Sequence, residues 1–161
     1  MNTMKKLTSL LLFLVLSVLS LQAQQAKYVF YFIGDGMGTN QVLGTEMYLS
    51  ELKGEIGVTP LLFAQFPYAA MASTFSATNG VTDSAAAGTA LATGHKTKNG
   101  SVGVTKDQTE ISSVAVWAKE NGYRVGVSTS VTVDHATPAS FYAHQGDRGS
   151  SAVYIGKMSH G

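Results

Sequence analysis

An apolar run that ends in a glycine-rich turn constrains the fold of this chain more than any other stretch. Residues 27–33 read Lys-Tyr-Val-Phe-Tyr-Phe-Ile and lead directly into Gly34-Asp35-Gly36-Met37-Gly38. A nearly continuous aromatic and β-branched run is typical of a strand that is buried on both faces of a parallel sheet. Thr39 or Asn40 can cap a helix over residues 41–49, which completes the first half of a βαβ unit.

The same alternation of strand and helix continues along the chain. The pattern predicts further strands over residues 68–75 and 123–129, a short extended piece over 102–104, and helices that start near Ser84 and run over 110–121 and 139–144. Asn99-Gly100 predicts a turn. We therefore expect an α/β fold with a mostly parallel sheet, in one domain over residues 24–161.

The charge of the chain excludes some partners. Its 11 Lys and Arg nearly balance its 10 Asp and Glu, for a net charge of +1 at pH 7. Nucleic acids and anionic membrane surfaces need clustered basic side chains, so we expect neither as a partner. The absence of cysteine excludes a disulfide framework and a lipid-anchored cysteine.

The first 23 residues have the pattern of a signal peptide. Lys5-Lys6 precedes an apolar run over residues 7–21, and Ala23 is a small residue at the expected cleavage point. The run is short for a membrane span, although an uncleaved anchor is the alternative. We expect a periplasmic or secreted protein without a stable membrane anchor after cleavage; an exported chain without cysteine suits a bacterial periplasm.

A second stretch, Thr82-Asp83-Ser84-Ala85-Ala86-Ala87-Gly88-Thr89-Ala90, has the composition of a tightly packed helix start. Thr82 or Asp83 can cap it, and alanine is the best helix former. Ser84 then lies in the first turn, where free N–H groups and the helix dipole favour negative charge. Ser84 is either an ordinary capping serine or a hydroxyl that can become an alkoxide or carry a phosphate.

Four more chemically capable residues follow or accompany predicted strand ends. Asp35, His135 and Thr137 are possible oxygen or nitrogen ligands of a metal. Arg148 has the planar fork that grips two oxygens of a phosphate. Three of them have an ordinary alternative: Asp35 as a turn aspartate, His135 as a capping or structural histidine, and Arg148 as a surface arginine. Active sites of open α/β sheets lie where strands end, so their common placement favours a site.

Several familiar motifs are excluded. After Gly34 and Gly36 the sixth position of a dinucleotide fingerprint is Thr39 instead of glycine. The spacing around Gly94 and Lys96 does not fit a phosphate-binding P-loop. Ser84 is not flanked by the glycines of a Gly-x-Ser-x-Gly nucleophile elbow.

Three separated motifs resemble those of the alkaline phosphatase family. Phe-Ile-Gly-Asp-Gly-Met-Gly at 32–38 is similar to the first metal-binding motif, and Thr82–Ala90 with Ala92-Thr93-Gly94 to the nucleophile motif. Residues 135–139 and 143–148 are similar to the block that carries magnesium ligands and an arginine. The resemblance covers residues 27–148 and implies the family's three-layer α/β sandwich with a mostly parallel central sheet, here truncated.

The resemblance also implies a role for each matched residue. Ser84 would be the nucleophile and a zinc ligand, and Asp83 would help to position Arg148, which holds the phosphate. Asp35 would bridge the second zinc and the magnesium site. Thr137 would be a magnesium ligand, and His135 stands where members carry Asp or His beside that third metal. The implied cofactors are two Zn²⁺ and one Mg²⁺.

The resemblance further implies hydrolysis of phosphate monoesters by a homodimer. Family members are much longer, and their later parts supply most zinc ligands. We therefore expect an N-terminal portion that is inactive by itself. Residues 149–161 do not resemble the family, either through divergence or through a shifted reading frame. Two alternatives stay open: a phosphodiester or sulfate ester hydrolase of the same superfamily, and a non-catalytic phosphate- or metal-binding protein.

Overall fold

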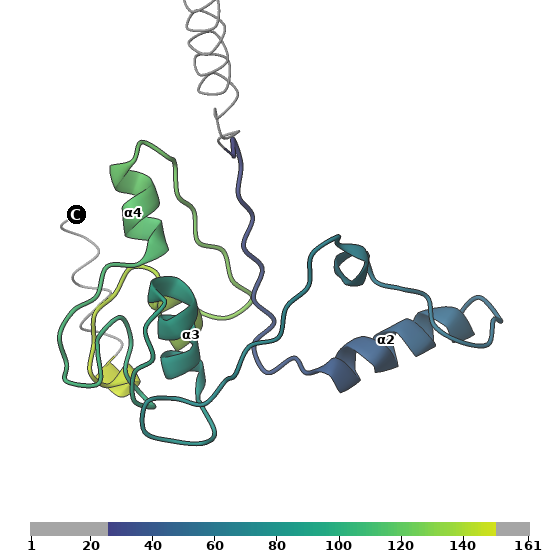
Figure 1. Ribbon diagram of the computed structural model, residues 1–161, viewed down its shortest axis with the longest axis horizontal. Helices are drawn as coiled ribbons and strands as arrows, with labels where there is room; N and C mark the ends of the chain where they lie inside the picture. Colours follow the sequence, from purple (N-terminus) through teal and green to yellow (C-terminus); the bar gives the residue numbers. More distant parts are fainter. Residues whose placement is uncertain (1–25, 151–161) are drawn as a thin grey trace, which may run out of the picture. The chain divides into compact units, whose positions relative to one another are not determined.

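The computed structural model describes residues 26–150. They belong to two units, the first ending at Gly34 and the second beginning at Asp35. The second unit holds all the described helices, in the order α2 (Thr39–Glu51), η1 (Leu62–Gln65), α3 (Ser84–Thr93), α4 (Val114–Glu120), α5 (Ala136–Ala139) and η2 (Arg148–Ser150) (Figure 1). The signal peptide predicted over residues 1–23 lies outside the described residues.

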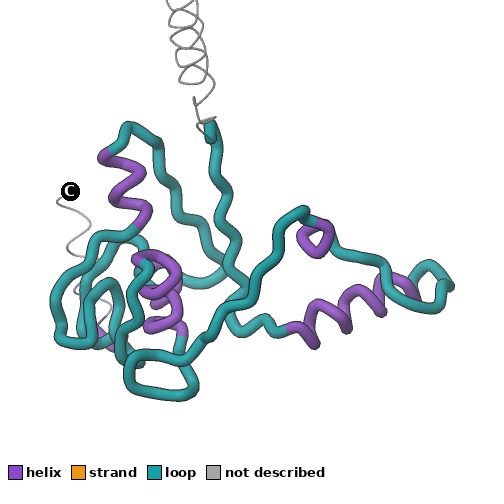
Figure 2. Tube along the Cα trace, in the orientation of Figure 1, coloured by secondary structure: helices purple, strands orange, loops and turns teal. Residues whose placement is uncertain are grey.

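Loops join these helices, and the described part of the chain contains no β-strand (Figure 2). The segments 27–33, 68–75 and 123–129 form no ladder within residues 26–150, contrary to the predicted strands. The prediction that the first of them is buried is also wrong there, because Phe30 and Phe32 are 79% and 87% exposed. A strand needs a neighbour for its backbone N–H and C=O groups, and the described residues provide none.

The extended piece predicted at residues 102–104 is present in modified form. Val102 forms an antiparallel bridge with Gln145, and Val104 forms one with Glu110. Between them Gly103 adopts a left-handed conformation with φ +61°. The backbone therefore turns at Gly103, and the two bridges do not join into one strand.

The bounds of three helices differ from the predicted ones. Helix α2 begins at Thr39 after Gly38, whose N–H bonds to the side chain of Gln41, so neither Thr39 nor Asn40 is the cap. Helix α4 begins at Val114 instead of residue 110, because the Ser113 hydroxyl accepts the N–H of Val116. Helix α5 spans Ala136–Ala139, whereas the prediction placed a helix over 139–144.

The core forms where small residues let α3 and α5 pack closely. Its buried cluster consists of Ala85, Val102, Ala136, Ala139 and Ala143. At the crossing, a Cβ added to Gly88 would lie 2.7 Å from Ser140 Oγ and 3.4 Å from Thr137 Cα. Gly88 thus allows the helix that begins at Ser84 to approach the segment that contains Thr137.

No helix among residues 26–150 combines the length and the apolar character that a membrane span requires.

Candidate active site

Ser84 is the first residue of α3, as the sequence predicts. Asp83 precedes it in extended conformation and caps the helix, because its Oδ1 accepts the N–H of Ala86 at 2.9 Å. Ser84 is half-buried, and its hydroxyl makes no hydrogen bond to another of the residues 26–150. The cap is therefore Asp83 and not Ser84, which leaves the serine hydroxyl available at the positive end of the helix dipole.

Asp83 connects three segments of the chain through its two carboxylate oxygens. Besides the bond of Oδ1 to α3, its Oδ2 accepts the backbone N–H of Gly100 at 3.0 Å. The same Oδ2 lies 3.4 Å from Arg148 Nη1 in an ion pair. The Asp83 side chain is 28% exposed and that of Arg148 is 34% exposed, so solvent screens the pair only in part.

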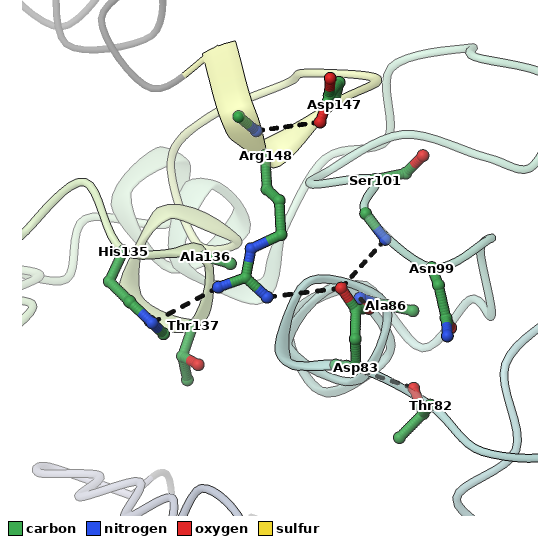
Figure 3. A network of polar contacts seen from close by, with 12 residues as sticks. Thr82, Asp83, Ala86, Asn99, Ser101, His135, Ala136, Thr137, Asp147 and Arg148 are labelled. Atoms are coloured by element: carbon green, nitrogen blue, oxygen red, sulfur yellow. Dashed lines mark hydrogen bonds and ion pairs between the residues drawn. The ribbon is translucent and has the colours of Figure 1, made fainter.

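The Arg148 side chain extends between Asp83 and His135, as Figure 3 shows. Its Nη1 faces Asp83, and its Nη2 lies 3.4 Å from His135 Nε2. Arginine only donates, so His135 Nε2 accepts in this contact and the ring proton is assigned to Nδ1. Arg148 and the residue beside Ser84, 65 positions apart in sequence, are thus held together.

His135 occupies the N-cap position of α5, but its side chain does not cap that helix. Its Nδ1 is buried and has no hydrogen-bond partner among the described residues. The capping alternative for His135 is therefore wrong for its side chain. An unpaired buried nitrogen carries a free-energy cost of about 1–3 kcal/mol, which a ligand or water at that atom would offset.

Asp35 and Thr137 meet although 102 positions separate them. The Thr137 hydroxyl donates to Asp35 Oδ2 at 2.9 Å. Asp35 is exposed in a turn with Gly36, whose φ is +70°. A carboxylate and a hydroxyl oxygen side by side suit a hard cation such as Mg²⁺, so these two residues fit the metal that the sequence suggests. Within residues 26–150, however, no three His, Cys, Asp or Glu side chains gather into a group able to hold a metal.

The sequence did not predict which residues bind the backbone of Arg148 and of the residues before it. The Arg148 N–H donates to Gly100 O at 2.7 Å, and the Ser101 hydroxyl donates to Gly146 O at 3.0 Å. His144 contributes a contact between Nδ1 and Gly103 O at 2.6 Å. The available signals are the Asn99-Gly100 turn and the family resemblance of the surrounding residues, and neither predicts which atoms the turn binds.

The family comparison agrees with this arrangement. The family model described as "Alkaline phosphatase" matches residues 26–157, so the expectation that residues 149–161 do not resemble the family is wrong for residues 149–157. The chain belongs to the alkaline phosphatase family. Among curated relatives, the human tissue-nonspecific isozyme of alkaline phosphatase is 36% identical over 144 residues, which is 83% of this chain and 28% of the relative. Alkaline phosphatase 4 of Drosophila melanogaster is 37% identical over 78% of this chain and 22% of the relative.

Solved alkaline phosphatase structures match as well. The enzyme of the Antarctic bacterium TAB5 is 35% identical with a TM-score of 0.65, over 79% of this chain and 35% of that one. The enzyme of Thermus thermophilus is 34% identical with a TM-score of 0.69, over 78% of this chain and 26% of that one. A mutant of the TAB5 enzyme is described with Mg bound in its M3 site. An alkaline-phosphatase-like fold is thus supported, and this chain spans about a third or less of the relatives' length.

Proposed function

We propose that this chain carries the nucleophile and the phosphate-gripping arginine of an alkaline phosphatase that hydrolyses phosphate monoesters through a phosphoserine at Ser84. The ion pair between Arg148 and Asp83 carries the proposal, because it ties the phosphate-binding fork to the residue directly before Ser84. The full fold would be the family's three-layer sandwich with a mostly parallel central sheet, in which segments such as 27–33 find neighbouring strands.

The protein's own residues supply binding, attack and charge stabilisation. Arg148 would donate to two equatorial oxygens of the phosphate, with Asp83 limiting the positions that the guanidinium can take. The Ser84 oxygen then attacks phosphorus as the ester P–O bond breaks and the alcohol leaves with a proton. Water attacks the phosphoserine in the second step, which releases inorganic phosphate and restores the Ser84 hydroxyl. The N-terminus of α3 favours the negative charge in both steps.

Two zinc ions and one magnesium ion are the proposed cofactors. Asp35 and Thr137 would hold magnesium with His135 near it, while Ser84 and Asp35 would contact zinc. When bound, such metals lower the pKa of the nucleophile and neutralise charge on the phosphate and the leaving oxygen. Most zinc ligands would have to come from outside residues 26–150, since the described residues hold no group of three suitable side chains.

We further propose that residues 24–161 are the N-terminal portion of the phosphatase domain. The whole protein would be a periplasmic or secreted homodimer, exported by residues 1–23. The short coverage of every reported relative supports the first statement. The homodimer is inferred from the family resemblance. The export by residues 1–23 and the periplasmic or secreted location are inferred from the signal-peptide pattern.

The test compares the complete gene product with the 161-residue chain in hydrolysis of a chromogenic phosphate monoester, each with added zinc and magnesium. We expect turnover by the former only, and a loss of at least about 1,000-fold in Ser84→Ala. Ser130→Ala is the matched control, because Ser130 is exposed and outside the site. Full activity in Ser84→Ala would refute the proposed nucleophile. Turnover by the 161-residue chain would refute its incompleteness, and faster cleavage of a phosphodiester would refute the substrate class.

A further inference from the structure

Residues 100–103 connect the helix of the nucleophile to the loop of the arginine. On the side of α3, Asp83 Oδ2 accepts the Gly100 N–H. Farther along α3, the Thr89 hydroxyl donates to Ser101 O at 3.2 Å and accepts the Gly103 N–H at 2.9 Å. Thr89 is fully buried, so these bonds are shielded from water.

The other edge of the same backbone holds residues 145–148. Val102 and Gln145 exchange two backbone hydrogen bonds of 2.8 and 2.7 Å. Gly100 O accepts the Arg148 N–H at 2.7 Å. Between these two points, the Gly146 N–H donates to the Gln145 side chain at 3.1 Å, and the Gly146 carbonyl accepts the Ser101 hydroxyl at 3.0 Å. The Ser101 bond is the one that joins Gly146 to residues 100–103.

Ser101 is well placed to donate this bond. It is fully buried, so its hydroxyl does not contact solvent. The side-chain N–H of Gln108 points to Ser101 Oγ at 3.4 Å and occupies an acceptor position. Since a hydroxyl has a single hydrogen, the proton of Ser101 is directed to Gly146 O. The figure of the network places Ser101 beside the loop that leads to Arg148 (Figure 3).

We propose that Ser101 is a positioning residue for Arg148, which sets the place of the guanidinium through Gly146; this inference rests on the proposed role of Arg148 in phosphate binding. An arginine fork binds two phosphate oxygens well only when both N–H groups are aligned. Without the hydroxyl, Gly146 O loses its side-chain donor and the backbone that precedes Arg148 gains freedom.

The test measures the dissociation constant for inorganic phosphate by titration calorimetry, on the complete gene product loaded with zinc and magnesium. We expect Ser101→Ala to raise this constant about fivefold, as the loss of one hydrogen bond predicts. Arg148→Ala, which removes the fork itself, is expected to raise it on the order of 100-fold.

Ser113→Ala is the matched control. Ser113 is also buried, and its hydroxyl also joins two segments, since it donates to Phe141 O at 2.6 Å and caps α4. We expect this variant to lower the melting temperature at least as much as Ser101→Ala does and to leave the phosphate constant unchanged. An equal rise in both serine variants would mean that Ser101 is merely structural.

The two proposals fail separately. If Arg148→Ala raises the dissociation constant for phosphate while Ser101→Ala leaves it within twofold of the value for the unsubstituted protein, the role of Ser101 alone is overturned. The proposed function is overturned as well if Arg148→Ala does not change the dissociation constant, or if the unsubstituted protein does not bind phosphate.

Discussion

Residues 83–148 form a buried apolar core, whereas residues 36–75 form none among the described residues. The first region contains the core of small apolar residues and a chain of hydrogen bonds from Asp83 to Arg148. In the second region Ser50 is buried, while large apolar side chains such as Met47, Leu62, Tyr68 and Met71 are at least half exposed. Alanine, glycine and hydroxyl side chains can complete a packed unit over short distances, whereas large apolar side chains need broad partner surfaces.

The two regions differ in which parts of the protein hold their side chains in place. The proposed nucleophile and arginine are positioned by groups within the described residues. The apolar side chains of residues 36–75 find no such cover there, and burial of each would contribute about 1.5–3 kcal/mol. We propose that the remainder of the phosphatase domain covers them.

The largest expected effect is that of Gly103→Ala, which tests the first region. Gly103 has a φ of +61°, and an added Cβ would collide with the carbonyl oxygen of Ala143. Strain and collision together are expected to remove about 3 kcal/mol or more of local stability. Hydrogen exchange of the 161-residue chain measures this loss of stability, because the amides of Val102 and Gln145 should exchange faster in the variant. Unchanged protection would show that the two segments are not held as described.

An intermediate effect is expected for Gly88→Ala, where α3 crosses α5. The added methyl would meet Ser140 Oγ at 2.7 Å, so the helices must separate at a cost of about 1–3 kcal/mol. Gly44→Ala is the matched control in α2, because a Cβ there has nothing within 4 Å. That control should stabilise its helix by up to about 1 kcal/mol. Equal effects of both substitutions on amide exchange would erase the contrast between the regions.

Much of the site could be predicted because it depends on local chemistry. The start of α3 at Ser84 and a cap at Thr82 or Asp83 follow from residue types within one helical turn. The start is confirmed, and of the two candidate caps the structure uses Asp83. The contact between His135 and Arg148 and the role of Ser101 in the arginine loop could not be predicted, because they depend on backbone geometry at the Gly100 turn.

The predicted strands show where local propensity is not enough to predict structure. Residues 27–33 have strong strand propensity, but a strand also requires a paired neighbour, which propensity does not report. Two helix starts also differ from the pattern, because Gly38 takes the cap expected at Thr39 or Asn40 and Ser113 caps a helix expected to begin at residue 110.

The smallest effect is expected in the second region of the 161-residue chain. Leu62 is 76% exposed, so Leu62→Ser should change local stability by no more than about 0.5 kcal/mol. In the complete gene product the same substitution should cost clearly more, if other parts of the domain cover Leu62. The loss of stability is measured by amide exchange of η1 in both proteins. Equally small losses would argue against burial of Leu62 by other parts of the domain.

The central claim is that Ser84 is the nucleophile, and trapping the intermediate tests it most directly. The complete gene product, with zinc and magnesium, is mixed with a phosphate monoester, quenched in acid and digested for mass spectrometry. We predict phosphate on Ser84 in the peptide that contains Asp83-Ser84-Ala85, and none in Ser84→Ala. Turnover with phosphate on a different residue, or turnover that persists in Ser84→Ala, would contradict the account.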